Sequence, residues 1–480
     1  MLSRMVGWPL LFLSLLLSLA LLSAAGGKSL FKVGIVSSVT GELTDWHESV
    51  EGWEVYKSKL DKEYPLGFPI IGNDATYRFS FELNIRDDES NLQKHEAAVA
   101  DLISEGVDFI ANAQPNFAME EALQSNKANL INIHGVTSNT AVFERALPNV
   151  FGLAQPMERF FPEPMKAFKD ANVDKVAIVY RGDLTELRVA CKAAVQAAEA
   201  KGLSVQEISY TSSDPEVLYG VTRQVNLSSS TLGLVGCTLS AEAHQFLNKI
   251  HEMRKPLKGI MFTNGPANHT WLEEVGELAL NVLTPASWHK DTDVTDYLMV
   301  SSTDYSLLYY LTMGTPPTHI AAGASACGYV LQKALEAAFT TCNIGATGGN
   351  AHALLFGDTN GNPLINCQDG QNFGKQRIID TLTDMYFDTF YGKVIFSPFR
   401  QNFVGHVRAL QVKRMTADLQ PYLAPMVALP RSKAVQEFVM PMPNRYKPSC
   451  QPGSMQNEDE YEPCISCEPG TYMDRVDSTY

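Results

Sequence analysis

Short apolar strands alternate with helical segments from Phe31 onward, and the alternation occurs in two successive blocks. In the first block, Lys32–Ser37 and Tyr77–Ile85 have the apolar character of buried strands, and a polar turn and a helical segment follow each. The second block repeats this order with Val176–Tyr180 and Gly259–Phe262. Strands that are connected through helices form largely parallel sheets. The pattern therefore predicts an α/β fold with two similar lobes.

Two loops in the first block follow strand-like segments and consist of small and polar residues. They contain Gln114-Pro-Asn116 and Gly135-Val-Thr137. Open α/β sheets hold their ligands at the carboxyl ends of parallel strands, which is where these loops are expected. The sequence contains no Gly-x-Ser-x-Gly elbow, no His-Glu-x-x-His and no phosphate-binding glycine loop. The loops thus favour binding of a small polar molecule over catalysis, and we expect neither a cofactor nor a metal.

The N-terminus has the features of a secretory signal peptide. Arg4 precedes a leucine-rich apolar run, Trp8–Leu22, and small residues follow at Ser23-Ala-Ala25. A retained membrane anchor is the less favoured alternative, because the apolar run is short and ends on small residues. We assign residues 1–25 to a signal peptide and expect a secreted or extracellular chain.

The charge balance excludes two classes of partner. Among 480 residues, 19% are charged and 45% are hydrophobic, which is typical of a soluble globular protein. The net charge is −15, and the chain has no block rich in Lys and Arg. Nucleic acids and anionic membranes attract basic surfaces, so we expect neither as a partner.

Eight cysteines agree with an oxidising compartment. Cys342 and Cys367 flank a Gly/Asn-rich insertion and are the preferred disulfide pair, whereas Cys191 and Cys237 are not assigned a partner. Cys327 lies in an apolar helical run and is expected to be a buried free thiol. The remaining disulfide candidates are near the C-terminus: Cys450, Cys464 and Cys467.

Two segments with distinct composition follow the second block. Residues 415–449 contain frequent prolines and are predicted to form an extended strap or linker. In residues 450–480, the sequence Cys450-Gln-Pro-Gly recurs as Cys467-Glu-Pro-Gly. We interpret residues 450–480 as a partial cysteine-rich module, in which disulfides replace a hydrophobic core.

Three short surface motifs carry less weight. Asn226 and Asn268 each begin an Asn-x-Ser/Thr triplet, which accepts N-glycans in secreted proteins. Residues 358–362 have the alternating oxygen ligands of a calcium loop, but Pro363 stands where that loop requires glycine. A hairpin turn at residues 360–361 is therefore the preferred interpretation.

Five short motifs occur in a characteristic order between residues 32 and 413. They are Val33-Gly-Ile-Val36 with Thr40-Gly41, Asp87-Asp-Glu-Ser90, Ala177-Ile-Val-Tyr180, Phe262-Thr-Asn-Gly265, and Phe387-Asp-Thr389 with Gly392. In this order they resemble the type I periplasmic-binding-protein family, which includes leucine/isoleucine/valine-binding proteins and the ligand-binding regions of class C G-protein-coupled receptors and natriuretic-peptide receptors. The resemblance implies a bilobal fold of two Rossmann-like parallel-sheet lobes, joined by crossover strands, that closes on a ligand in the interlobe cleft.

The resemblance also assigns the lobes and the site. Lobe 1 would comprise residues 30–154 and 286–350, and lobe 2 residues 155–285 with a return at 388–414. The two polar loops would hold a ligand carboxylate, and an aromatic ring would cover the ligand. The implied ligand-binding residues are Trp46, Gln114, Asn116, Gly135, Thr137, Tyr180, Thr185 and Asn264.

The chain departs from amino-acid binders of this family in two places. Those proteins usually have serine in the first loop, where this chain has Ala113-Gln-Pro115, and often an acidic residue near Asn264. Asp183 or Glu186 could supply the acidic partner of an ammonium group instead. We therefore expect an amino-acid-like or small polar, amide-like ligand.

Five of the implied site residues also have a structural interpretation. Trp46 alternatively caps the core of lobe 1, and Thr137 caps a helix. Gln114 and Asn116 alternatively satisfy loop backbone groups, and Asn264 forms a turn.

Two functions remain open from the sequence. The first is the ligand-binding region of a receptor, because the tail resembles the cysteine-rich repeats of receptor ectodomains. That interpretation predicts a membrane segment or membrane partner beyond Tyr480, and a homodimer through lobe 1 is a further expectation. The second is a secreted solute-binding protein of an ABC-type transporter for amino acids or amides. An enzyme is the least favoured class.

Overall fold

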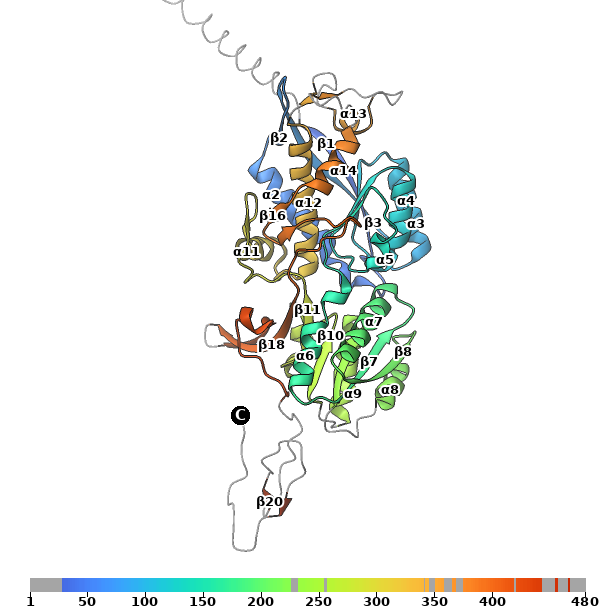
Figure 1. Ribbon diagram of the computed structural model, residues 1–480, viewed down its shortest axis with the longest axis vertical. Helices are drawn as coiled ribbons and strands as arrows, with labels where there is room; N and C mark the ends of the chain where they lie inside the picture. Colours follow the sequence, from blue (N-terminus) through green and yellow to red (C-terminus); the bar gives the residue numbers. More distant parts are fainter. Residues whose placement is uncertain are drawn as a thin grey trace, which may run out of the picture.

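Two α/β lobes are stacked along the long axis of the molecule in the computed structural model (Figure 1). The structure describes residues 28–225, 232–253, 257–340, 342–344, 350–357, 365–367, 374–417 and 420–442, and the strand pairing of 454–455 with 465–466. Several predicted features lie outside the described residues: the signal peptide at 1–25, Asn226, the turn at 360–361, Cys450, Cys464 and Cys467.

Lobe 1 contains a six-stranded sheet in the order β2-β3-β1-β4-β5-β6, parallel except for β2. Its strands are β1 (Ser29–Ser37), β2 (Phe68–Ile71), β3 (Thr76–Asp87), β4 (Phe109–Asn112), β5 (Ile131–His134) and β6 (Val150–Gly152). Helical segments that flank it are η1 (Thr44–Trp46), α2 (Glu48–Glu63), α3 (Leu92–Ser104), η2 (Pro115–Phe117), α4 (Ala118–Lys127), α5 (Thr140–Phe143), α11 (Ser302–Met313), α12 (His319–Ala338), α13 (Ala351–Phe356) and α14 (Gly374–Asp384).

Strand β1 shows why this sheet is covered on both faces. Val33 and Ile35 belong to the large apolar cluster that includes residues of α2 and α12. Val36, pointing the opposite way, packs with Val99 and Leu102 of α3. Successive side chains of a strand alternate between faces, so an almost entirely apolar strand needs a helical layer on each side.

Lobe 2 contains a seven-stranded sheet in the order β19-β18-β11-β10-β9-β7-β8. Its strands are β7 (Lys175–Arg181), β8 (Ser204–Tyr210), β9 (Leu232–Cys237), β10 (Gly259–Phe262), β11 (Leu283–Ala286), β18 (Arg408–Ala417) and β19 (Gln420–Leu429). Its helical segments are η3 (Met157–Arg159), α6 (Pro162–Asp170), α7 (Thr185–Ala200), α8 (Pro215–Gln224), α9 (Ser240–Glu252), α10 (His269–Val275), η4 (Gly276–Ala279) and η6 (Arg431–Lys433).

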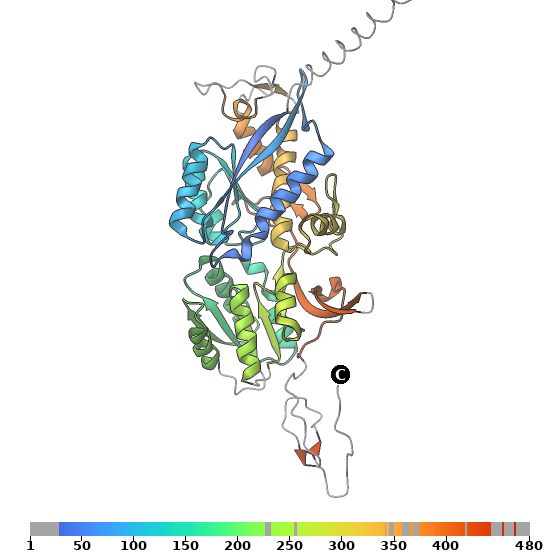
Figure 2. The same cartoon turned by 180° about the vertical axis from the view of Figure 1, so that it is seen from behind.

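The same alternation organises lobe 2. In β7, Val176 and Ile178 join the cluster formed with α6 and α7, whereas Ala177 and Val179 join the cluster formed with α8 and α9. The view from behind shows these helices on the two faces of the sheet (Figure 2). The predicted repetition of an α/β unit is confirmed, and β10 has the predicted bounds, Gly259–Phe262.

The chain passes between the lobes after β6, after β11 and before β18, within the described residues. The loops after β4 and β5 of lobe 1 contact the first turn of α7 in lobe 2. Glu186 N–H donates to Asn116 Oδ1 at 3.2 Å, and Ser138 N–H donates to Glu186 Oε1 at 2.9 Å. The carboxyl ends of parallel strands in both sheets therefore face the junction.

The boundaries of lobe 1 differ from those predicted. Helices α13 and α14 and the hairpin of β16 (Phe387–Thr389) and β17 (Gly392–Val394) contribute to the lobe 1 core, although we expected that lobe to end at 350 and lobe 2 to resume at 388. Phe390 stacks on Tyr305 with ring centroids 4.1 Å apart. The apolar hairpin fills space beside Trp288, so the return to lobe 2 begins only at β18.

The predicted strap at 415–449 is also wrong in its first part. Strand β19 pairs antiparallel with β18 and forms the edge of the lobe 2 sheet. Pro421 and Pro425 stand opposite Thr416 and Val412 in this pairing. Proline lacks a backbone N–H, and a sheet edge is where that loss is tolerated.

Two disulfides are present among the described residues. Cys342–Cys367, the predicted pair, joins the short strands β14 (Cys342–Asn343) and β15 (Asn366–Cys367). Cys191–Cys237 joins α7 to β9, and this pairing was not predicted. Cys327 is a buried free cysteine, as expected.

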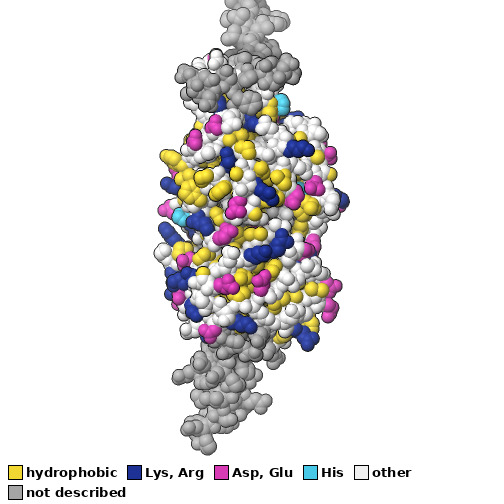
Figure 3. Space-filling view, turned by 45° about the vertical axis from the view of Figure 1, so that its right-hand side comes forward, with side chains coloured by type: hydrophobic (Ala, Val, Ile, Leu, Met, Phe, Trp, Pro, Cys, Tyr) yellow, Lys and Arg dark blue, Asp and Glu magenta, His cyan; other side chains and the backbone are white. Residues whose placement is uncertain are grey.

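The surface lacks a single-sign block on the face drawn in Figure 3, where acidic and basic side chains are interspersed. Within the described residues, no helix is long and apolar enough to span a membrane. Two short pairings complete the elements: β12 (Thr295–Asp296) with β13 (Val300–Ser301), and β20 (Ser454–Met455) with β21 (Ile465–Ser466).

Candidate ligand-binding cleft

Two adjoining cavities lie between the lobes and share Thr263, Asn264 and His319 in their walls. The smaller, of about 60 Å³, is lined by Trp46 of lobe 1 and Glu186 of lobe 2. The larger, of about 530 Å³, is bounded by η1, α2 and the α11–α12 connection on one side and by residues 240–274 on the other. Both lobes contribute walls, so opening or closing the lobes would change both cavities.

Gln114 and Asn116, in the first predicted loop, use their amide groups within the protein. Gln114 Nε2 donates to Ser38 Oγ at 2.7 Å and to the Leu43 carbonyl at 3.2 Å. Gln114 Oε1 accepts from the side-chain amide of Asn116 at 3.1 Å, and Asn116 Oδ1 accepts from Glu186 N–H at 3.2 Å. These bonds fix the loop and join it to lobe 2.

The second predicted loop has a similar character. Thr137 is fully buried, and its hydroxyl donates to Asn112 Oδ1 at 2.8 Å. The helix cap that was its alternative role belongs to Asn139, which accepts from Ala141 N–H at 3.1 Å. At Gly135, a Cβ atom would lie 2.8 Å from the backbone of Gly323, so glycine permits close packing of the loop on α12.

Trp46 and Asn264 are the predicted residues that line the cavities. Trp46 is 5% exposed and belongs to an apolar cluster with Tyr180 and Leu187 of lobe 2, so it packs across the cleft. Asn264 Nδ2 donates to Asp45 Oδ2 at 3.1 Å.

Tyr180 and Thr185 stand apart from the cavity walls. The Tyr180 hydroxyl donates to Glu207 Oε1 at 2.5 Å, within lobe 2. Thr185 begins α7, and its hydroxyl oxygen accepts from Arg188 at 3.4 Å. The structure therefore brings together only part of the predicted set.

Three acidic residues of lobe 1 that sequence reasoning missed reach across the cleft. Asp45 accepts from Ser240 N–H at 2.8 Å, as well as from Asn264. Glu48 accepts from Asn268 Nδ2 at 2.8 Å. Glu42, the third member, pairs with Arg181. We call Glu42, Asp45 and Glu48 the acidic row.

Arg181 is the cationic centre of this contact. It is 4% exposed and lies 2.8 Å from Glu42, 2.8 Å from Asp183 and 2.6 Å from Glu242. Glu242 is fully buried and also accepts from Tyr210 at 2.7 Å. The hydrogen bond from Arg181 holds the pKa of Glu42 below its usual value. One guanidinium thus compensates several carboxylates from both lobes.

Desolvation between the lobes changes the acidity of the other carboxylates. It raises the pKa of Asp45 to about 6, although the hydrogen bonds from Ser240 and Asn264 oppose the shift. It raises the pKa of Glu48 to about 7, and the nearby charge of Glu51 adds to this effect. Closure therefore favours the protonated form of both groups.

Asn268, a predicted glycan acceptor, caps α10 by accepting from Trp271 N–H at 3.0 Å. The amide nitrogen to which a glycan would be attached is the atom that donates to Glu48. The Asn268 side chain therefore caps a helix of lobe 2 and also bonds to lobe 1 across the cleft.

Three polar atoms in the wall of the smaller cavity have no hydrogen-bond partner among the described residues: Glu186 Oε2, Thr263 Oγ1 and His319 Nδ1. Glu186 is 5% exposed, and burial raises its pKa to about 8. Burial lowers the pKa of His319 to about 4, so its imidazole is neutral near pH 7. Unpaired buried polar atoms are costly, and a bound ligand or water removes that cost.

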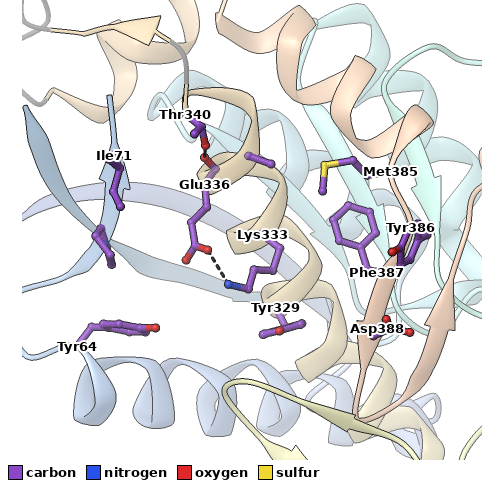
Figure 4. Close-up of a pocket in the computed structure, with 12 residues that line it drawn as sticks. Tyr64, Ile71, Tyr329, Lys333, Glu336, Thr340, Met385, Tyr386, Phe387 and Asp388 are labelled. Atoms are coloured by element: carbon purple, nitrogen blue, oxygen red, sulfur yellow. Dashed lines mark hydrogen bonds and ion pairs between the residues drawn. The ribbon is translucent and has the colours of Figure 1, made fainter. Parts of the chain in front are cut away.

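A further cavity of about 520 Å³ lies on lobe 1, away from the cleft (Figure 4). Tyr64 and Tyr329 line it, and Lys333 pairs with Glu336 at 2.6 Å. A third charged lining residue, Asp388, lies 3.9 Å from Lys393. Because these charged residues are paired and the walls come from one lobe, the interlobe cavities are the better candidate site. No group of three His, Cys, Asp or Glu side chains in the described part of the chain could hold a metal ion.

Two α/β lobes with facing strand ends and cavities between them define a bilobal binding protein of the clamshell type. The sequence profile of a family described as periplasmic binding protein matches residues 31–417. The chain belongs to this family, as the order of motifs suggested. None of the curated proteins matches it in sequence.

Solved structures with the same fold include the leucine binding protein LivK from Thermotoga maritima, with a TM-score of 0.60, 14% identity, and coverage of 84% of this chain and 99% of that one. The branched-chain amino acid substrate binding protein LivJ from Streptococcus pneumoniae, in complex with isoleucine, gives a TM-score of 0.61, 11% identity, and coverage of 84% and 100%. A solute binding protein from Rhodopseudomonas palustris, in complex with 3,4-dihydroxy benzoic acid, gives a TM-score of 0.60 and 15% identity. The match covers 84% of this chain and 99% of that one. At these identities the likeness shows the fold alone.

Proposed function

We propose that this protein binds a small molecule between its lobes and changes the population of open and closed forms when it does so. The observation that carries this proposal is the pair of adjoining interlobe cavities at the strand ends of both sheets. A ligand that contacts both lobes stabilises the closed form by its differential affinity. The family supports the proposal, since the similar structures are named as substrate- or solute-binding proteins.

Trp46 and Asn264 are the predicted residues that we propose as direct ligand contacts. Both line the smaller cavity, one from each lobe. Gln114, Asn116 and Thr137 support the site by fixing the loops behind it, because their polar groups are engaged within the protein.

The protein would act outside the cytoplasm. Two disulfides among the described residues fit an oxidising compartment. The signal peptide proposed for residues 1–25 agrees with this location. Catalysis forms no part of the proposal.

Two settings for the binding event are proposed. The repeat of Cys450-Gln-Pro-Gly at Cys467 favours a receptor ligand-binding region that connects to a membrane segment or membrane partner and dimerises through lobe 1. The similar ABC transporter substrate-binding protein from Sphaerobacter thermophilus favours delivery of a solute to a transporter. Two assays would distinguish the receptor setting from the transporter setting. A receptor should transmit lobe closure along its own chain, whereas a solute-binding protein should bind to a separate transporter.

Thermal-shift screening of amino acids, amides, amines and small carboxylates would test the binding function. A ligand that binds only the folded state raises the melting temperature by mass action. Small-angle X-ray scattering of the same protein should show compaction with the ligand. The matched variants Trp46→Phe and Trp46→Ala should lose affinity progressively, whereas absence of binding across the whole panel would contradict the proposal.

A further inference from the structure

We propose that the ligand is a small primary amine with an apolar body and no carboxylate, whose ammonium group is held by Glu186. This inference rests on the proposed binding function and specifies the class of ligand. It departs from the amino-acid-like and amide-like ligands expected from the sequence.

The first argument is the unused oxygen of Glu186. Its Oε1 accepts from Ser138 N–H at 2.9 Å, which fixes the carboxyl group. Its Oε2 is buried without a hydrogen-bond partner among the described residues, and Glu186 lines the smaller cavity. The hydroxyl of Thr263 and the neutral ring nitrogen of His319 are unpaired in the same wall. An ammonium group has three N–H donors, which matches one carboxylate oxygen and two neutral acceptors.

The second argument is the charge of the surrounding walls. The cavity linings include five acidic side chains, namely Glu186, Asp45, Glu48, Glu51 and Glu274, and no Lys or Arg among the described residues. Arg181, close to the acidic row, is already shared by Glu42, Asp183 and Glu242. Burial raises the pKa values of Glu186, Glu48 and Asp45, and a bound cation would lower them again and favour the ionised carboxylates. Walls of this kind therefore stabilise a cation and disfavour a carboxylate.

The third argument is that the side-chain donors of the two predicted loops are already engaged. The Gln114 amide donates to Ser38 and Leu43, and the Thr137 hydroxyl donates to Asn112. A carboxylate could recruit these two side-chain donors only by breaking buried hydrogen bonds. The side chains of Gln114 and Thr137 therefore favour a structural role over contact with a carboxylate.

The remaining wall selects an apolar body. Trp46, Met157, Phe160 and Leu187 line the smaller cavity beside Glu186. Its volume of about 60 Å³ admits an ammonium group with its first carbon atoms, and the adjoining cavity of about 530 Å³ admits the rest. Burial of that apolar body would supply affinity, while the charged group supplies selectivity.

Three matched triplets of probes test the inference by isothermal titration calorimetry on the full chain. Each triplet has one side chain with an amine, a carboxylate or both: phenethylamine, 3-phenylpropionate and phenylalanine; tyramine, 3-(4-hydroxyphenyl)propionate and tyrosine; isoamylamine, 4-methylpentanoate and leucine. We expect the amine to bind at least about tenfold more tightly than its two counterparts in at least one triplet.

A conservative variant assigns the effect to Glu186. In Glu186→Gln the side chain can still accept from Ser138 N–H, but it presents no negative charge to the cavity, so affinity for the amine should fall about ten- to hundredfold. Glu199→Gln, which removes an exposed acid from the same helix, is the matched control and should bind the amine normally. Thermal melting of both variants verifies that they are folded.

The outcomes separate this inference from the proposed function. Preferred binding of a carboxylate or an amino acid would overturn the amine assignment while supporting a binding function. Amine binding that Glu186→Gln leaves unchanged would overturn the role of Glu186. Failure of all nine probes would count against both the amine assignment and the binding function.

Discussion

The two polar loops of lobe 1 and the acidic row differ in how they use their hydrogen-bonding groups. Gln114 and Thr137 have the residue types and strand-end positions of a binding site, yet their side chains bond within the protein. Asp45 in η1 and Glu48 at the start of α2 are not residues that the strand-end rule selected, yet they form hydrogen bonds across the cleft. The position of residues at strand ends therefore predicts where the cleft lies. Which polar atoms are free to bind a ligand depends on which of them already form hydrogen bonds within the protein.

The largest expected effect comes from removing the cation that both lobes share. Arg181→Met leaves Glu242 fully buried without its guanidinium partner, and breaking a buried pair in this way costs about 3–5 kcal/mol. Urea unfolding should show this loss in the free energy of unfolding. A loss below about 1 kcal/mol would mean that Arg181 is not the electrostatic centre of the closed form.

The pH dependence of closure should be the next largest effect. Asp45 and Glu48 have pKa values of about 6 and about 7 when closed, and exposure on opening should return both toward their ordinary values near 4. The closed form then binds more protons than the open form between pH 4 and 7. Closure should therefore strengthen as pH falls from 8 to 5, on the order of 2 kcal/mol per group.

Scattering measured from pH 8 to pH 5 would reveal this as a decrease in the radius of gyration. The groups that face Asp45 are Ser240, Asn264 and Glu242, and those that face Glu48 are Thr318, Asn268 and Glu51. Glu48→Gln should flatten the profile, and the exposed Glu54→Gln on the same helix should not. An increase in the radius of gyration as the pH falls would contradict the proposed coupling between carboxyl protonation and closure of the lobes.

Substitution in the predicted loop should affect stability more than binding. Thr137→Ala leaves buried Asn112 Oδ1 without its donor, which should cost about 1–2 kcal/mol of folding free energy. Affinity for a confirmed ligand should change less than about twofold, since no ligand contact is lost. Thr137→Ser, which keeps the hydroxyl, should be close to wild type in both measurements. A large loss of ligand affinity in Thr137→Ala without a loss of folding stability would instead indicate that this loop contacts the ligand.

The sequence predicted features that are local in the chain better than those that join distant segments. The bounds of β10 follow from a short apolar run, and Cys342–Cys367 is separated by only 25 residues. Cys191–Cys237 joins a helix to a strand three elements further on, and no pattern in either element indicates the other. Asp45 contacts Ser240 and Asn264, which are 195 and 219 residues away in the sequence, so only the packed lobes reveal its role.

The smallest effect is expected at the exposed end of the same ion cluster. The Glu42 side chain is 44% exposed, although it bonds to Arg181 at 2.8 Å and to Ser213 at 2.6 Å. Glu42→Gln should cost less than about 1 kcal/mol, because water screens this pair, and the effect should diminish as salt increases. Urea unfolding at low and high ionic strength would measure this change in the free energy of unfolding. Ser213→Ala, which removes only the hydrogen bond from the serine hydroxyl to Glu42, is the matched control.

The relative stability costs of substituting Glu42 and Arg181 indicate how easily the two lobes can separate. If Glu42→Gln proved as costly as Arg181→Met, the contact between the lobes would behave as a rigid core, and opening would require partial unfolding. A small cost at Glu42 with a large cost at Arg181 places the strong pair, Arg181–Glu242, inside lobe 2 and leaves weaker bonds across the cleft. A protein that must open to admit a ligand needs that distribution, since only the interlobe bonds are broken on opening.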